Sequence, residues 1–235
     1  NRDNSSVSIL QNNNGVFSVS QTLSVDERPI RTASGDWDAD SDADLAVLLR
    51  DSTQVQIWLN SGTGSFSKQT TSYAVGSSPI DMITGDWDCD GNPDLAVSNT
   101  GDDTISLIYG KGNGTFAEHI AINSGRGPGS MASADFNNDN KMDFVVGHRF
   151  LVSTPGVSLL TGDFSLTLSD TSSVTGYASS VSFAATTEED GAPPAEIVII
   201  DADNDSKLDL LITLPLAKKL AVLFGKQFTG KLTCP

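Results

Sequence analysis

The sequence predicts an all-β protein built from a repeated unit of four strands. A nine-residue acidic loop recurs four times, with its first aspartate at residues 36, 86, 135 and 201, so the spacings are 50, 49 and 66 residues. Short apolar runs rich in branched residues flank the loops and are too short for helices. A period near 50 residues is typical of arrays in which each unit buries its faces against its neighbours.

The units share one predicted order of elements. First strands are predicted before the loops at 29–33, 79–84 and 195–200. Second strands follow the loops at 45–49, 95–97, 144–146 and 210–212, and third strands come next at 55–59, 105–108, 157–160 and 220–224. Glycine-rich turns at 61–66 and 110–116 introduce fourth strands. Because four strands make up a propeller blade, we predict a β-propeller of four-stranded blades.

About five blades fit into the 235 residues, which we predict to form a single domain, 1–235. The repeats span about 1–28, 29–78, 79–128, 129–190 and 191–235, and the first is partial because it holds only a third and a fourth strand. Three arrangements fit this phase: a compact five-bladed ring, part of a larger propeller, or a ring completed by another chain. The long interval of 66 residues between the third and fourth loops leaves open an extra strand at 176–183 or a surface loop at 187–194.

Oxygen donors at positions 1, 3, 5 and 9 dominate each acidic loop. This pattern suits a hard cation such as Ca²⁺, which takes about six to eight oxygens, and no His or Cys recurs in register for a softer metal. An EF-hand would need Glu at position 12, where this chain has Val47, Val97, Val146 or Ile212. The candidate side-chain ligands are Asp36, Asp38, Asp40, Asp44, Asp86, Asp88, Asp90, Asp94, Asp135, Asn137, Asp139, Asp143, Asp201, Asp203, Asp205 and Asp209.

The segments 85–97 and 107–116 resemble the FG-GAP (VCBS) repeat of integrin α-subunit propellers and many secreted proteins. The similarity extends from about Asn4 to Lys231 and is strongest in the first two acidic loops. It implies one Ca²⁺ between two strands of each blade, up to four in all. It also implies that the backbone carbonyls at position 7 are ligands, namely those of Asp42, Asn92, Lys141 and Lys207.

The net charge of −16 excludes nucleic acid and anionic membrane surfaces as favoured partners. Fifteen of the 30 acidic residues occupy the four side-chain ligand positions, so four Ca²⁺ would reduce the net charge to about −8, an ordinary surface value. No apolar run reaches 18 residues, so we predict no membrane span.

Other loop positions carry structural expectations. Trp37, Trp87 and Phe136 at position 2 are predicted to be apolar plugs rather than a sugar-stacking set, because strand-like alternation turns them away from the ligands. Position 6 favours left-handed backbone, at Ser41, Gly91, Asn140 and Ser206. Cys89 should point away from the metal, and the pair Cys89 and Cys234 leaves free thiols or one bridge open.

The chain shows no catalytic motif. His119 and His148 stand without a partner Cys or recurring Glu, so we predict that it is not an enzyme. The predicted function is a calcium-binding, extracellular or cell-surface β-propeller that acts in adhesion, protein binding or assembly. Its partner would be a protein or glycan ligand on the extracellular side, with self-assembly through the incomplete N-terminal blade as a further option. The alternative is part of a secreted carbohydrate-binding protein or carbohydrate-active enzyme.

Overall fold

The computed structural model describes residues 1–124, 126–134, 142–148, 156–160, 196–204, 208–214 and 219–223. Apart from one turn of 3-10 helix, η1 (Arg2–Asn4), the regular structure in these residues is β-strand, which confirms the all-β prediction. No helix in this part of the chain is long and apolar enough to cross a membrane. The segments 176–183 and 187–194, Phe224 and Cys234 lie outside the described residues.

The strands of the described residues form five antiparallel sheets, which we number in chain order. Sheet 1 contains β1 (Ser6–Asn13) and β2 (Val16–Ser24). Sheet 2 contains β3 (Pro29–Gly35), β4 (Asp44–Leu49), β5 (Gln54–Asn60) and β6 (Phe66–Ala74), and sheet 3 contains β7 (Pro79–Gly85), β8 (Asp94–Asn99), β9 (Thr104–Ile108) and β10 (Ile120–Asn123). Sheet 4 contains β11 (Pro128–Ala134), β12 (Asp143–His148) and β13 (Gly156–Leu160), and sheet 5 contains β14 (Glu196–Ile200), β15 (Asp209–Leu214) and β16 (Lys219–Leu223).

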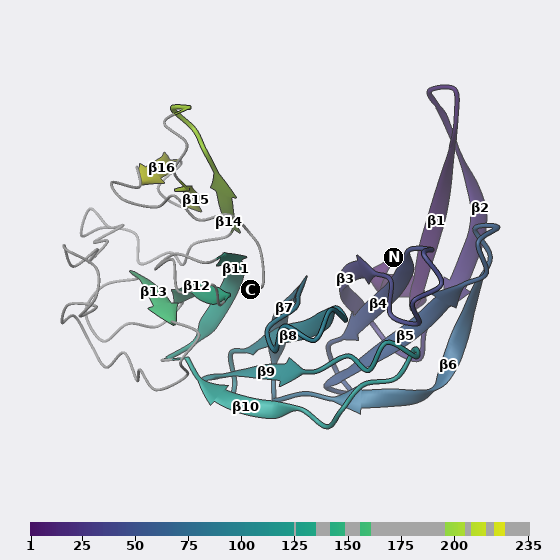
Figure 1. Cartoon of the computed structure of the whole chain (residues 1–235), viewed down its shortest axis with the longest axis horizontal. Helices are drawn as coiled ribbons and strands as arrows, with labels where there is room; N and C mark the ends of the chain where they lie inside the picture. The colour runs from purple at the N-terminus through teal and green to yellow at the C-terminus, as the bar shows by residue number, and fades with distance from the viewer. Residues whose placement is uncertain are drawn as a thin grey trace.

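Each sheet is a meander whose strands pair in sequence order. The first strands of successive sheets contact one another, β3 with β7, β7 with β11 and β11 with β14. Figure 1 shows these strands on the concave side of an arc, with the later strands of each sheet farther out. This radial stacking is that of propeller blades. Sheets 1 and 5 lie at the two ends of the arc, so the described residues alone do not close a ring.

The sequence patterns missed the strand β11. Its sequence, Pro-Gly-Ser-Met-Ala-Ser-Ala, has few branched residues and gave no strand signal. In the structure β11 contacts both β7 and β14, and most of its residues are buried. Small side chains suit a strand that packs closely between β7 and β14. The composition of β11 therefore reflects this close packing rather than intrinsic strand propensity.

The hydrophobic core lies in layers between successive sheets. Sheets 2 and 3 enclose one layer, which includes Leu48, Ile57, Leu95 and Val97, all with no exposed surface. Further layers lie between sheets 1 and 2 and between sheets 3 and 4. Because a sheet packs on both faces, the second strands β4 and β8 are buried almost throughout. This explains their continuous apolar runs, which do not alternate as a half-exposed strand would.

Sheet 1 contains only β1 and β2 among the described residues. The inner half of this hairpin packs on sheet 2 through Leu23 and Val25. Its outer half projects beyond the arc in Figure 1 and exposes the apolar residues Leu10, Val16, Phe17 and Val19.

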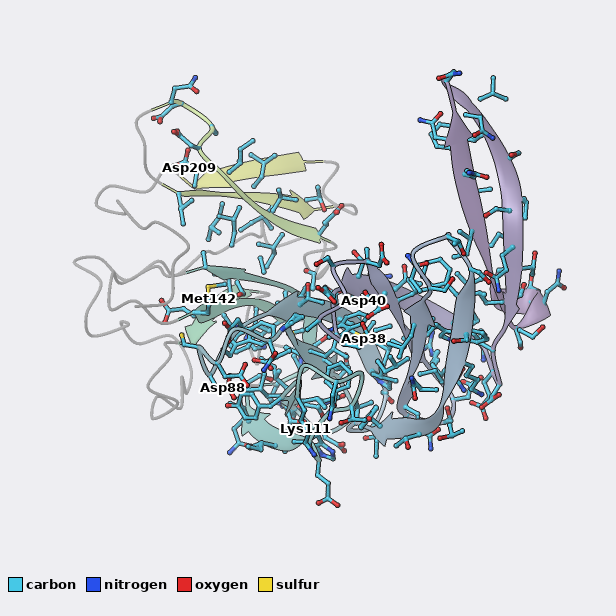
Figure 2. All side chains as sticks on the ribbon, turned by 45° about the vertical axis from the view of Figure 1, so that its right-hand side comes forward. Asp38, Asp40, Asp88, Lys111, Met142 and Asp209 are labelled. Carbon is cyan, nitrogen blue, oxygen red and sulfur yellow. The ribbon has the colours of Figure 1, made fainter. Side chains whose placement is uncertain are left out.

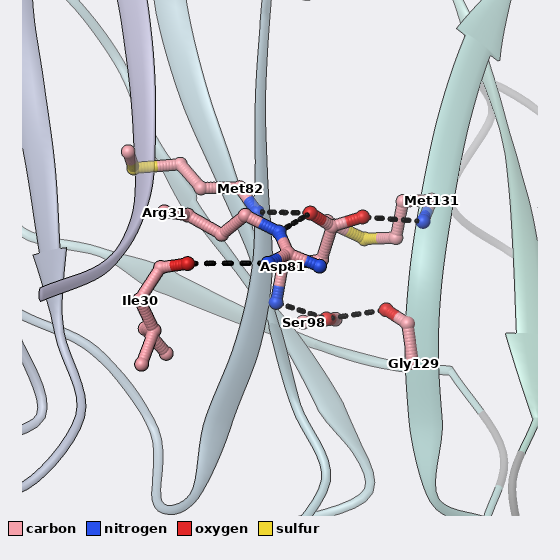
Figure 3. Close-up of polar contacts among 7 residues, drawn as sticks. All are labelled: Ile30, Arg31, Asp81, Met82, Ser98, Gly129 and Met131. Carbon is pink, nitrogen blue, oxygen red and sulfur yellow. Dashed lines mark hydrogen bonds and ion pairs between the residues drawn. The ribbon is translucent and has the colours of Figure 1, made fainter. Parts of the chain in front are cut away.

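A polar network ties three successive first strands together (Figure 3). The Arg31 guanidinium donates Nε–H to Asp81 Oδ1 at 2.8 Å, and Asp81 Oδ2 accepts the Met131 backbone N–H at 2.9 Å. The Ser98 hydroxyl oxygen accepts the Asp81 N–H at 3.1 Å, and the hydroxyl donates to the Gly129 carbonyl at 2.6 Å. One carboxylate on β7 therefore bridges to both β3 and β11.

We predict that Asp81→Ala destabilises the protein by about 1–3 kcal/mol, because the Met131 N–H loses its acceptor and Arg31 loses its partner. The matched control is Asp51→Ala, which removes the exposed Arg28–Asp51 ion pair and should cost less than about 1 kcal/mol. Urea unfolding of both variants checks this. Equal losses in the two variants would contradict a special role for Asp81.

Candidate metal loops

The ninth-position aspartate anchors each described acidic loop inside the sheet. One of its oxygens accepts the backbone N–H of position 2, in the pairs Trp37 to Asp44 at 2.9 Å, Trp87 to Asp94 at 2.8 Å and Ala202 to Asp209 at 2.7 Å. In the first two loops the other oxygen accepts an N–H from the end of the third strand. Asn60, the last residue of β5, donates to Asp44, and Gly110, just after β9, donates to Asp94, both at 2.8 Å. These carboxylates are fully buried. In the first two loops, position 9 therefore joins the loop and the start of the second strand to the end of the third strand.

The carboxylates at positions 1, 3 and 5 converge on one point. Three ligand atoms lie within 4.8 Å of one another in the set Asp36, Asp38 and Asp40 and again in the set Asp86, Asp88 and Asp90. Figure 2 shows Asp38 and Asp40 together, with Asp88 and Asp209 at separate places on other sheets. Oxygens brought this close can coordinate one cation together.

Backbone N–H groups hold these carboxylates in place. The carboxylate at position 1 accepts N–H groups from positions 5 and 6, at 3.1 and 3.0 Å in the first loop and at 3.2 and 3.1 Å in the second. The carboxylate at position 5 accepts the N–H of position 7 at 2.9 and 2.8 Å. The two loops therefore share the same hydrogen bonds, which orient the oxygens of positions 1 and 5.

Left-handed residues produce this curled loop conformation. Position 6 has positive φ at Ser41 (74°) and Gly91 (87°), as the sequence predicts. Position 4 has positive φ as well, at Ala39, Cys89 and Asn204, which the sequence did not reveal. Alanine and cysteine rarely adopt this conformation, so their backbone strain is imposed by the surrounding loop bonds.

The electrostatics of the loops favour a bound cation. Asp38 Oδ1 is buried without a hydrogen-bond partner. The pKa of Asp38 is raised, mainly by burial and to a smaller extent by the negative charges of Asp44 and Asp40. Burial likewise raises the pKa of Asp88 and Asp44. It raises the pKa of Asp94 to about 6 despite two N–H donors. A cation would supply both the missing partner of Asp38 and the missing positive charge.

The side chain at position 7 lies against the glycine-rich turn that follows the third strand. A Cβ placed on Gly62 would overlap Asp42 Oδ2, and one placed on Gly112 would overlap Asn92 Oδ1. The glycines after the third strands therefore make room for position 7 as well as forming a turn. The Asn92 side-chain amide also donates to Asp90 Oδ2 at 2.8 Å. The role of the Asp42 and Asn92 backbone carbonyls as ligands remains a prediction.

The aromatic residues at position 2 are plugs, as predicted. Trp37 is 1% exposed and Trp87 is 7% exposed, so neither ring is available for stacking on a sugar. Trp37 belongs to the core layer between sheets 2 and 3, and Trp87 to the layer between sheets 3 and 4. Phe136 lies outside the described residues. Cys89 at position 4 is a free, half-buried thiol.

The third and fourth loops are described in part. Asp143 is buried at the start of β12, and Asp201, Asp203 and Asp209 bring three oxygens within 4.8 Å of one another. The remaining predicted ligands lie outside the described residues: Asp135, Asn137, Asp139, Lys141, Asp205 and Lys207. The position-6 residues Asn140 and Ser206 lie outside them as well.

Comparison with known families identifies the repeat. A family model described as an FG-GAP-like repeat matches twice, over residues 36–97 and 86–146. The chain therefore carries FG-GAP-like repeats. Each FG-GAP match begins at position 1 of one acidic loop and ends at position 12 of the next, and together they include the first three loops. None of the curated proteins matches the chain.

Asp94 provides a pH test of the second FG-GAP loop. Its pKa of about 6 in the folded protein exceeds the ordinary value of 3.8, so in chelator-treated protein the folded state binds this proton more tightly than the unfolded state. The protonated Asp94 therefore contributes to the stability of the folded state. This contribution is fully present below about pH 3.8 and is lost as the pH rises through about 6.

We therefore expect the Asp94 carboxyl carbon of chelator-treated protein to titrate in NMR with a midpoint of about 6. The melting temperature should fall between about pH 5 and pH 7, and less so in the Asp94→Asn variant. A midpoint close to 3.8 would show that burial does not control this carboxyl group.

Proposed function

We propose that this chain is a calcium-binding FG-GAP β-propeller module in which each ion stabilises an acidic loop. The observation that carries the proposal is the convergence of three carboxylates within 4.8 Å, which recurs in the first, second and fourth loops. Uncompensated, such a cluster is destabilised by like-charge repulsion. A divalent cation would replace that repulsion with attraction and would hold the loop against the first and second strands of its sheet.

Calcium is the cation that this donor set suits best. The converging atoms are carboxylate oxygens. The proposal adds to them the backbone carbonyl groups at position 7. Ca²⁺ accepts about six to eight such oxygens in flexible geometry, whereas Mg²⁺ demands a near-octahedral arrangement and retains waters. The proposal assigns one Ca²⁺ to each loop and up to four to the chain.

We place the module outside the cell, in adhesion, protein binding or assembly rather than catalysis. Calcium sites with dissociation constants of about 10⁻⁴–10⁻³ M can fill in extracellular fluid. FG-GAP-like repeats support this setting. In the proposal the ions are structural: they fix the loops between the first and second strands, and connecting loops on a rigid scaffold are where binding residues gather. The partner is a protein or glycan ligand.

The matched pair Asp38→Asn and Asp42→Asn tests the first site. Asp38 has a buried oxygen without a partner in the cluster, whereas the Asp42 side chain points toward Gly62. We predict that Asp38→Asn weakens calcium binding at the first loop by about tenfold or more, equivalent to about 1.4 kcal/mol, while Asp42→Asn changes it by less than about threefold. Isothermal titration calorimetry and residue-resolved NMR titration measure both.

Calcium should also raise the melting temperature of the unmodified chain. An ion that binds only the folded state stabilises it by about 2.7 kcal/mol at a concentration one hundred times its dissociation constant. A melting temperature unaffected by calcium or chelator, together with no calorimetric binding, would overturn the proposed function. Equal weakening by the two aspartate substitutions would instead overturn the assignment of ligands.

A further inference from the structure

The first acidic loop is in contact with the sheet that follows its own. Trp37, at position 2 between the first two ligand positions, packs its ring against Phe116, with ring centroids 5.9 Å apart and an interplanar angle of 58°. Phe116 belongs to sheet 3, where it ends the glycine-rich turn 110–116 between β9 and β10. Both rings are buried.

The main chain makes a second contact between the same segments. The Gly114 N–H donates to the Trp37 carbonyl at 2.7 Å. That carbonyl belongs to the peptide unit that joins Trp37 to Asp38. A Cβ placed on Gly114 would lie 3.6 Å from Asp38 Cβ and 3.0 Å from Leu59 Cδ1, so the turn passes directly beside the ligand position.

A second residue of sheet 2, Tyr73, also contacts this turn. Tyr73 on β6 packs edge-on against Phe116, with centroids 5.2 Å apart, and its hydroxyl oxygen accepts the Phe116 N–H at 3.0 Å. The Trp37 N–H is meanwhile bound by Asp44. The peptide units on both sides of Trp37 are thus fixed, one by its own loop and the other by the neighbouring repeat.

We infer that Gly114 and Phe116 are positioning residues for the first acidic loop, and that calcium binding there is coupled to the seating of turn 110–116 on sheet 2. The inference rests on the proposed calcium function. The turn orients the peptide before Asp38, and with it the carboxylate whose Oδ1 is buried without a partner. Because coupling is reciprocal, calcium in this loop also tightens the contact between the two sheets.

The tryptophan of the second loop has a different ring partner among the described residues. Trp87 stacks on Phe144 of β12, with centroids 5.0 Å apart and an interplanar angle of 26°, and makes no ring contact with Phe116. The turn 110–116 also contacts the second loop, where the Gly110 N–H donates to Asp94 at 2.8 Å, but the Phe116 ring packs on Trp37 and Tyr73. A change confined to the Phe116 ring should therefore weaken the first loop more than the second, and both loops are compared in every sample.

Phe66 provides a matched control position. It ends the equivalent turn of sheet 2, as Gly64-Ser65-Phe66 against Gly114-Thr115-Phe116. Phe66 packs on the layer between sheets 1 and 2, and its N–H donates to the Gln21 side chain at 2.9 Å. Phe66→Leu removes the same atoms as Phe116→Leu without touching Trp37.

The experiment is an NMR calcium titration of the full chain that follows the amides of Ser41 in the first loop and Gly91 in the second. We expect Phe116→Leu to weaken binding at Ser41 by about fivefold or more, the lower range of allosteric coupling, and to weaken binding at Gly91 less than at Ser41. Phe66→Leu should leave both within about twofold. Unchanged binding at Ser41, equal weakening at both loops, or an equal effect of Phe66→Leu would overturn the inference.

Hydrogen exchange in the unmodified chain tests the same coupling without a variant. Calcium should slow exchange of the Gly114 amide by about fivefold or more. It should leave nearly unchanged the Lys111 amide, which bonds to Thr115 within the turn itself. Calcium binding at Ser41 without slower exchange at Gly114 would overturn the inference but leave the proposed function intact. Absence of binding at every loop would overturn the proposed function itself.

Discussion

The buried ninth-position aspartate is the interaction on which the sheets and their loops depend. A carboxylate enclosed in a sheet is stable only when its oxygens are bonded, and Asp44 and Asp94 each accept two backbone N–H groups. Those donors come from the loop and from the end of the third strand. A single side chain thus fixes the loop entry, the start of the second strand and the register of the third, with the remaining carboxylates held above it.

The same construction places the acidic loops at the junctions between sheets. Position 2 turns away from the carboxylates and inserts its aromatic ring into the core layer shared with the next sheet, at Trp37 and again at Trp87. The residues that carry the charge on one face of the loop therefore alternate in the sequence with the residue that packs in the core on the other face. A cation bound by the loop would act on packing between sheets as well as on the loop itself.

Contacts between repeats are polar along the inner strands and apolar farther out. Along the inner strands, Asp81 links β7 to β3 and β11 through charged and backbone hydrogen bonds. Farther out, apolar layers with almost no exposed surface separate the sheets. Since sheets 2, 3 and 4 each pack against a sheet on either side, the stability of one repeat depends on the next, as in other repeat arrays.

The sequence by itself determined the repeat, the all-β class, most strands and the convergence of the carboxylates, because spacing along a short loop fixes which oxygens can meet. It also predicted the buried position-2 tryptophans and the left-handed position 6. It did not reveal β11, because small residues selected for close packing carry no strand signal. Nor did it reveal the left-handed position 4 at Ala39 and Cys89. Only the tertiary structure decided that Gly114 and Phe116 lie on the loop of the preceding repeat, because contacts between segments about 80 residues apart depend on how sheets stack and leave no local pattern.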